Sequence, residues 1–290
     1  MQYCGACASC LYFNRRRCFA MNSKIKNSAA EIGITGARMP VMFVGHGNPM
    51  NAVEENEFSR AWAEMGRLTP KPKAILCVSA HWETAGTQVT AMQKPKTIHD
   101  FYGFPRKLYE MHYSAPGSPE LAGTVQELVR ASRVSADLDW GIDHGAWSVL
   151  CHMFPAADVP VVQLSLDQTK DPAFHYALAG ELRQLRDSGV LIIGSGNIVH
   201  NLGVIDWGGG AYDWALEYDE KVKELILAKD HESITEYQKL GKAARLSIPT
   251  NEHYLPLLYA LALRDADDKI SFFAEKVTLG SVSMRSVMIG

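Results

Sequence analysis

The chain has 290 residues, of which 47% are hydrophobic and 21% charged, and its formal net charge is -3. This composition predicts a globular protein with enough apolar residues for one large domain. The scattered basic residues exclude an extended nucleic-acid or anionic-membrane surface and favour a small-molecule partner. No apolar stretch approaches the roughly 20 residues of a membrane span, and the amino terminus lacks a secretory signal, so we expect a cytoplasmic protein.

The amino-terminal segment, residues 1–38, has no periodic pattern, and we expect a disordered extension ahead of a single catalytic domain at residues 39–290. Its cysteines have the spacing C-x2-C-x2-C-x7-C: Cys4, Cys7, Cys10 and Cys18. This spacing is compatible with a zinc or iron-sulfur site. The segment could equally be a disordered tail or translated upstream sequence, because Met21 and Met39 are both suitable starts.

Short apolar runs alternate with helical patterns along the rest of the chain. The strands predicted are 41–44, 74–80, 86–92, 159–166, 190–195, 270–277 and 281–289. The helices predicted are 54–68, 118–130, a short helix that follows a turn at 140–147 and ends at 154, 171–188, a charged, solvated region at 212–246, and an apolar helix ending near 263. This order predicts an α/β fold of three α/β/α layers around a mostly parallel, mixed central sheet.

Three predicted strands are followed by a histidine: His46, His81 and His200. The carboxyl ends of parallel strands meet at one edge of a sheet, so these histidines are expected to converge in a shared polar site there. His144 lies in a glycine-containing turn, and His253 stands where a helix begins. Imidazole is the commonest metal ligand. Three or four such nitrogens with an open position would suit zinc or ferrous iron.

Any one of these histidines taken alone could be a hydrogen-bonded structural residue. The other five are expected to be structural, although one of them lies in an aromatic loop where it could touch a substrate: His99, His112, His152, His175 and His231. Asp143, which precedes His144, could orient an imidazole or could cap the following helix.

Six motifs occur in a recognisable order: Gly45–Met50 (GHGNPM), Ser79–Trp82 (SAHW), His99–Phe101 (HDF), Asp143–Trp147 (DHGAW), Ser195–Asn201 (SGNIVHN) and Glu252–Leu258 (EHYLPLL). Together they resemble the class III extradiol ring-cleavage dioxygenases, in particular the DOPA 4,5-dioxygenase-like branch. The resemblance extends from about residue 39 to the end of the chain.

The resemblance implies a divalent metal held by His46, His81 and His253, with Glu252 as an alternative to the last. His200 matches the catalytic histidine, which in some zinc-loaded members also joins the coordination shell, and His144 matches a second active-site histidine. Residues expected to contact the substrate are His99, Asn48 and Tyr254.

The activity implied is cleavage of a catechol ring by O2, with His200 as general base and His144 stabilising developing negative charge. DOPA would give a seco-DOPA that cyclises to a betalamic-type product. Iron(II) would support turnover, whereas zinc, which an all-histidine site binds more tightly, has no redox change. The alternatives are a zinc hydrolase using the same histidines and a non-catalytic ligand-binding member of the fold. A monomer or small homo-oligomer is expected.

Overall fold

A mixed sheet of eight strands forms the centre of residues 38–290, the part of the chain that the structure, a computed structural model, describes. The strand order is β4-β3-β5-β2-β6-β1-β10-β7, and β8 and β9 form a separate pair. The strands are β1 (Val41–Gly45), β2 (Ala74–Thr84), β3 (Thr87–Thr90), β4 (Val134–Asp137), β5 (Val161–Asp167), β6 (Val190–Gly196), β7 (Ile270–Phe273), β8 (Val277–Thr278), β9 (Val282–Ser283) and β10 (Ser286–Ile289). The predictions for the extension and its four cysteines lie outside the described residues.

The middle of the sheet is parallel and its flanks contain antiparallel pairs. β1 and β2 both run parallel to β6, with Gly45 opposite Gly196 and Ser79 opposite Ser195. β10 is antiparallel to both β1 and β7, and β3 is antiparallel to β5. The carboxyl ends of β1, β2 and β6 therefore meet at one edge, which confirms the mixed, mostly parallel sheet.

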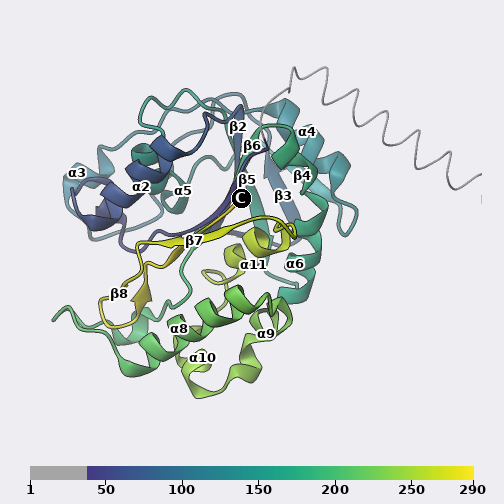
Figure 1. Cartoon of the computed structure of the whole chain (residues 1–290). Coiled ribbons are helices and arrows are strands. Elements are labelled where there is room, and N and C mark those ends of the chain that lie inside the picture. Colours follow the sequence, from purple (N-terminus) through teal and green to yellow (C-terminus); the bar gives the residue numbers. More distant parts are fainter. Residues whose placement is uncertain (1–37) are drawn as a thin grey trace, which may run out of the picture. The chain divides into compact units, whose positions relative to one another are not determined.

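Helices cover both faces of the sheet, as the three-layer prediction requires. The α-helices are α2 (Glu57–Leu68), α3 (Arg106–Tyr109), α4 (Pro119–Leu128), α5 (His144–Met153), α6 (Pro172–Glu181), α7 (Gln184–Asp187), α8 (Asp213–Ala228), α9 (His231–Thr235), α10 (Lys242–Ser247) and α11 (Leu255–Ala262). Short 3-10 helices are η1 (Pro49–Ala52), η2 (Leu202–Val204) and η3 (Tyr237–Leu240). Figure 1 shows α2 and α5 on one side of the sheet and α8 and α11 on the other.

Alternate residues of β1 face two different hydrophobic cores. Val41 and Phe43 pack into the core shared with α4, α6, α8 and α11. Met42 and Val44 pack into the core shared with α2 and α5. A strand that is buried on both faces must be apolar at every position, which explains the unbroken hydrophobic run.

Several predicted boundaries were wrong. β2 continues through His81 to Thr84, because it pairs with β5 again at Glu83 after an irregularity in register. The helix predicted at 171–188 divides into α6 and α7, and the strand β4 was not predicted.

The carboxyl-terminal predictions also needed correction. The region 212–246 is not only a solvated layer, since Tyr218 and Val222 of α8 are buried in a core. The two closing strands predicted at 270–277 and 281–289 are each interrupted, which gives β7 and β8, and β9 and β10.

Candidate metal centre

Five histidines from five separate segments gather at the carboxyl edge of the sheet: His46, His81, His144, His200 and His253, called here the histidine cluster. The ring centroids of His46, His81 and His253 lie 5.0 to 5.3 Å apart. Ligand nitrogens of these three residues all lie within 4.8 Å of one another. The expected convergence of residues distant in sequence is confirmed.

Glycines in β6 let the segment that carries His253 lie directly on the strand. A Cβ at Gly196 would stand 2.1 Å from the His253 carbonyl oxygen, and one at Gly194 would stand 2.2 Å from that of Pro256. The His253 carbonyl also accepts a hydrogen bond from the backbone N–H of Asn197 at 2.8 Å. Only glycine permits so close an approach, so the Gly-Ser-Gly end of β6 fixes the position of His253.

Ser195 determines which nitrogen of His46 carries the proton. The Ser195 hydroxyl donates to the Gly145 carbonyl at 2.5 Å, so its single proton is already used. The same oxygen lies 3.0 Å from His46 Nδ1 and must therefore accept a hydrogen bond from it. His46 Nε2 is left with a free lone pair.

Carboxylates play the same part for the other two rings. Asp100 Oδ2 lies 3.3 Å from His81 Nδ1, and Glu252 Oε1 lies 2.9 Å from His253 Nδ1. A carboxylate accepts hydrogen bonds, so His253 carries its proton on Nδ1 and has a lone pair on Nε2. A His81 that binds a metal through Nε2 would carry its proton on Nδ1, beside Asp100, in the same way. Metal-binding histidines are held in this way by the partner of their second nitrogen.

These rings are neutral near neutral pH. Burial, followed by the neighbouring imidazoles, lowers the pKa of His46 well below its ordinary value. Burial, followed by the charge of His200, lowers the pKa of His253 in the same direction. The pKa of His81 falls to about 3, mainly because of burial. Neutral imidazole is the form that binds metals.

The donor set fits a divalent cation. His46 Nε2 and His81 Nε2 are 3.1 Å apart. They meet either through a proton on His81 Nε2 or, when both rings carry their proton on Nδ1, as two lone pairs that a cation would draw together. Three neutral nitrogens that leave further positions open are a ligand set for zinc or ferrous iron.

His144 lies beside this set and is held by Asp100. Its Nδ1 is 2.9 Å from Asp100 Oδ2, and its backbone N–H donates to Asp100 Oδ1 at 2.9 Å. Burial opposes ionisation of Asp100, but the hydrogen bonds and charge of His144 and the charge of His81 hold the pKa of this carboxyl below its usual value. Asp100 was not among the predicted site residues.

Asp143 caps α5 and does not orient an imidazole, which settles the two alternatives left by the sequence. Its carboxylate accepts hydrogen bonds from the Ala146 backbone, the Ser79 hydroxyl and the Gln163 amide. Burial raises the pKa of Asp143, although the bonds from Ser79 and Gln163 act against this rise.

His200 stacks on His253 with ring centroids 3.4 Å apart and an angle of 11° between the planes. A ligand nitrogen of His200 groups with His253 and Glu252, but not with His46 and His81. Burial is the main cause that lowers the pKa of His200 to about 4, and the field of Glu252 acts against it. His200 is therefore a neutral base at the side of the three-histidine set.

The residues expected to contact the substrate have different positions. Tyr254 is 1% exposed, and its hydroxyl donates to the Ile234 carbonyl in a core, so its side chain is directed away from the histidine cluster. His99 donates from Nε2 to the Met111 carbonyl. The ring of Phe101, which contacts both His99 and His144, links His99 to the cluster. Asn48 caps η1 just after His46. The roles of His99, Asn48 and Tyr254 stay predictions.

Phe101 belongs to the HDF motif but was not among the residues expected to contact the substrate. Its ring meets His144 edge-on at 5.4 Å and also contacts His99 at 5.8 Å. Phe104 and Tyr109 extend the same aromatic wall. The richness of aromatic residues in the loop after His99 was the available signal. Such a wall suits a flat aromatic ligand.

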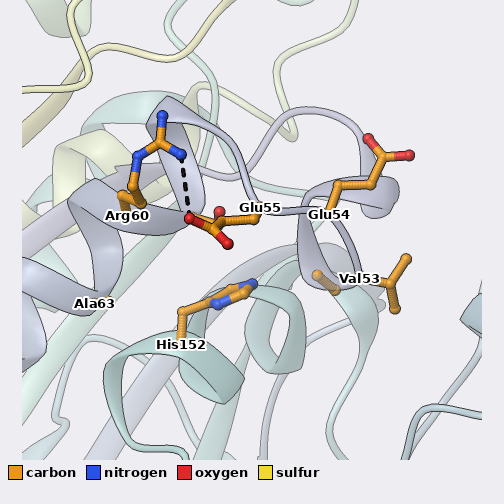
Figure 2. A pocket seen from close by; sticks show the side chains of 8 residues that line it. Val53, Glu54, Glu55, Arg60, Ala63 and His152 are labelled. Atoms are coloured by element: carbon orange, nitrogen blue, oxygen red, sulfur yellow. Dashed lines mark hydrogen bonds and ion pairs between the residues drawn. The ribbon is translucent and has the colours of Figure 1, made fainter.

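A hollow of about 370 Å³ between η1, α2 and α5 lies elsewhere and contains none of the cluster (Figure 2). Its lining includes Glu54, Glu55, Arg60 and His152, and Arg60 pairs with Glu55 across it. His152 donates from Nε2 to the Asn51 carbonyl, which supports its predicted structural role. We therefore place the candidate site at the histidine cluster.

Comparisons with known proteins agree with this choice. The family described as "Catalytic LigB subunit of aromatic ring-opening dioxygenase" matches residues 38–288. A protein of Escherichia coli (strain K12) called "4,5-DOPA dioxygenase extradiol" is 46% identical over 267 residues, which are 90% of this chain and 98% of that protein. A protein of the same name from Beta vulgaris is 40% identical over 78% of this chain and 87% of its own length.

A solved structure has the same fold. The crystal structure of an uncharacterised protein from Escherichia coli K12 matches with a TM-score of 0.77 and 43% identity, covering 87% of this chain and all of that one. Within residues 38–290, every helix is too short or too polar to span a bilayer.

Proposed function

Since the chain belongs to the family of the catalytic LigB subunit of aromatic ring-opening dioxygenases, we propose that it cleaves DOPA or a closely related catechol between ring positions 4 and 5. The chain is an extradiol dioxygenase, and enzymes of this family use a metal and O2. The choice of DOPA is supported by relatives that carry this name and align over most of the chain. The expected product is a seco-DOPA that cyclises to a yellow, betalamic-type compound.

One observation carries the proposed metal site: three imidazoles from distant segments have their Nδ1 atoms beside Ser195, Asp100 and Glu252, and their ligand nitrogens within 4.8 Å of one another. His46, His81 and His253 are the proposed ligands. The bound metal would supply a Lewis acid and a route for electrons between the catechol and O2. We propose iron(II) for turnover, because zinc has no redox change available.

His200 is the proposed general base. It is neutral near pH 7, lies beside the three ligands and has a ring nitrogen near Glu252 and His253. A neutral imidazole in this place can accept a proton from a catechol hydroxyl and return it later. We propose this role in place of coordination, because the ligand nitrogen of His200 does not group with those of His46 and His81.

His144 is the proposed donor to developing negative charge. Its Nδ1 lies 2.9 Å from Asp100 Oδ2, so its Nε2 is the nitrogen that we propose to face the substrate. A donor that the protein already holds in place stabilises charge without reorganisation during the reaction. Phe101, which contacts the His144 ring edge-on, would cover the face of a bound catechol.

The test is anaerobic reloading of metal-free protein with iron(II) or zinc, followed by measurement of O2 uptake and yellow product on addition of DOPA. Uptake is expected with iron alone. His200→Gln should lower turnover by roughly 10²–10⁴-fold while it keeps its metal, whereas the exposed control His112→Gln should not change turnover. Full iron loading without O2 uptake on DOPA or any other catechol would refute the proposal, and O2-independent ester cleavage would favour the hydrolase.

A further inference from the structure

We propose that Asp100 is a positioning residue that holds two members of the histidine cluster, His81 and His144, with a single carboxylate. Its Oδ2 lies 3.3 Å from His81 Nδ1 and 2.9 Å from His144 Nδ1. The naming of these two histidines as metal ligand and charge-stabilising donor rests on the proposed function. The contacts themselves do not depend on it.

The rings of His81 and His144 lie close together, so their orientations must be fixed relative to each other. Their centroids are 3.9 Å apart with an angle of 48° between the planes. If either ring turned its Nδ1 lone pair toward the shared carboxylate, lone pair and negative charge would repel each other. The carboxylate therefore selects the Nδ1–H form of both rings at once, and both Nε2 atoms are directed away from it.

Asp100 is itself held rigidly. Thr97 forms a parallel bridge with Ile142, and backbone hydrogen bonds of 2.8 Å join Ile98 to Ile142 and Ile142 to Lys96. Gly141 is required for this pairing, since a Cβ there would stand 2.3 Å from the Lys96 carbonyl oxygen. The carboxylate thus belongs to a fixed piece of backbone.

Helix α5 also holds Asp100 and the segment before it in place. Asp100 Oδ1 accepts the backbone N–H of His144, the first residue of α5. The Trp147 indole N–H, one turn further along, donates to the Ile98 carbonyl at 2.7 Å. Residues 96–98 are therefore joined to the chain both before His144, at Ile142, and after it, at Trp147. A shift of His144 would disturb the contact with Asp100.

The functional consequence is a link between the metal and the donor. A displacement of Asp100 would release the ring of a ligand and the ring of the donor together. Residues that orient ligating histidines typically change metal affinity by roughly 10–100-fold when they are replaced. Asp100→Asn keeps the shape of the side chain but leaves one oxygen to accept from three groups: the Nδ1–H of His81, the Nδ1–H of His144 and the His144 backbone N–H. The amide N–H₂ of the asparagine is a donor and would repel an Nδ1–H.

Two readouts other than activity test this. The first is zinc affinity, measured by competition with a chromophoric chelator. Asp100→Asn should bind zinc roughly 10–100-fold more weakly than the wild type. The matched control is Asp139→Asn, an exposed aspartate in the turn after β4, and its affinity should be unchanged. An affinity of Asp100→Asn within about twofold of the wild type would overturn the proposal.

The second readout is the tautomer of the His144 ring, measured by NMR on protein with ¹⁵N-labelled histidine. In the wild type this ring should carry its proton on Nδ1, and in Asp100→Asn a share of Nε2–H should appear. Since the wild-type measurement needs no variant, it decides the question even if Asp100→Asn does not fold. An Nε2–H ring at His144 in the wild type would overturn the proposal.

A different function for the same residues is also distinguishable. His81, Asp100 and His144 could hold a second ion, because their ligand atoms also lie within 4.8 Å of one another. A zinc content above one ion per chain that is lost in Asp100→Asn would overturn the positioning role. Neither zinc affinity nor the tautomer depends on catechol or O2, so failure of DOPA turnover would refute only the proposed function.

Discussion

Replacing Ser195 with alanine is a sharp test of how His46 is prepared for a metal. The change removes one oxygen that accepts from His46 Nδ1 and donates to the Gly145 carbonyl. Ser195 is completely buried and His46 is 2% exposed, so water cannot replace the lost partner. The His46 ring would then be free to place its proton on Nε2, a form that cannot bind a metal through that atom.

The magnitude follows from the groups that lose their partners. A buried polar group left without a hydrogen bond costs about 1–3 kcal/mol. We expect the free energy of unfolding of the metal-free Ser195→Ala protein to fall by about 2 kcal/mol, which for a domain of this size lowers the Tm by about 4–8 °C. Zinc affinity should fall by roughly 10–100-fold, as for other residues that orient a ligating histidine.

The assay combines a zinc competition titration with urea unfolding of the metal-free protein. Ser148→Ala is the matched control, because Ser148 is also buried but its hydroxyl has no hydrogen-bond partner within residues 38–290. Ser148→Ala should keep both the zinc affinity and the free energy of unfolding of the wild type. If Ser195→Ala loses no more stability than the control and binds zinc within about twofold of the wild type, the assignment of the His46 proton is wrong.

Two further changes probe backbone packing and buried charge. Gly196→Ala places a Cβ against the His253 carbonyl and should lower the free energy of unfolding, measured in urea, by about 1–3 kcal/mol. Gly180→Ala in α6, where the space around the Cβ position is open, is the control and should not lower it. Equal losses of stability in the two variants would contradict the packing argument. Burial lowers the pKa of His175 to about 4, below its unfolded value of about 6.5. Its stabilising contribution is therefore complete above about pH 6.5 and is lost as the pH falls toward 4. His175→Gln should reduce the loss of unfolding free energy between pH 7 and pH 5 by about 2 kcal/mol, and an unchanged slope would show that His175 is not the titrating group.

The periodicity of the sequence was sufficient for the layers and the central strands, because these follow from local rules. Strands buried on both faces must be apolar throughout, and Ser118, the first residue of the range predicted for α4, caps this helix by accepting from the Leu121 backbone. Boundaries that depend on distant partners were missed. β2 runs past His81 because β5 pairs with it again at Glu83, and nothing local to β2 indicates this.

In the site, too, features set by local sequence could be predicted and features set by distant partners could not. The convergence of His46, His81 and His200 follows from strand ends, which the sequence reveals. Asp100 could not be identified, because its position depends on the pairing of residues 96–98 with Ile142, far along the chain. Tyr254 follows His253 where α11 begins, and successive residues there point in different directions, so Tyr254 packs into a core while His253 joins the cluster.

The position of β1 between β6 and β10 bears on the synthesis of the protein. β1 is among the first strands that a ribosome makes, whereas β10 is the last, and His253 follows His46 by about 200 residues, which corresponds to about 10–40 s of translation at about 5–20 residues per second. During most of that interval β1 lacks both of its final neighbours, since β6 ends only at Gly196 and β10 follows His253, and its apolar faces and backbone edges need protection from other chains. The three-histidine set becomes complete only when the chain is almost finished, so the three proposed ligands could not together hold an ion before that point.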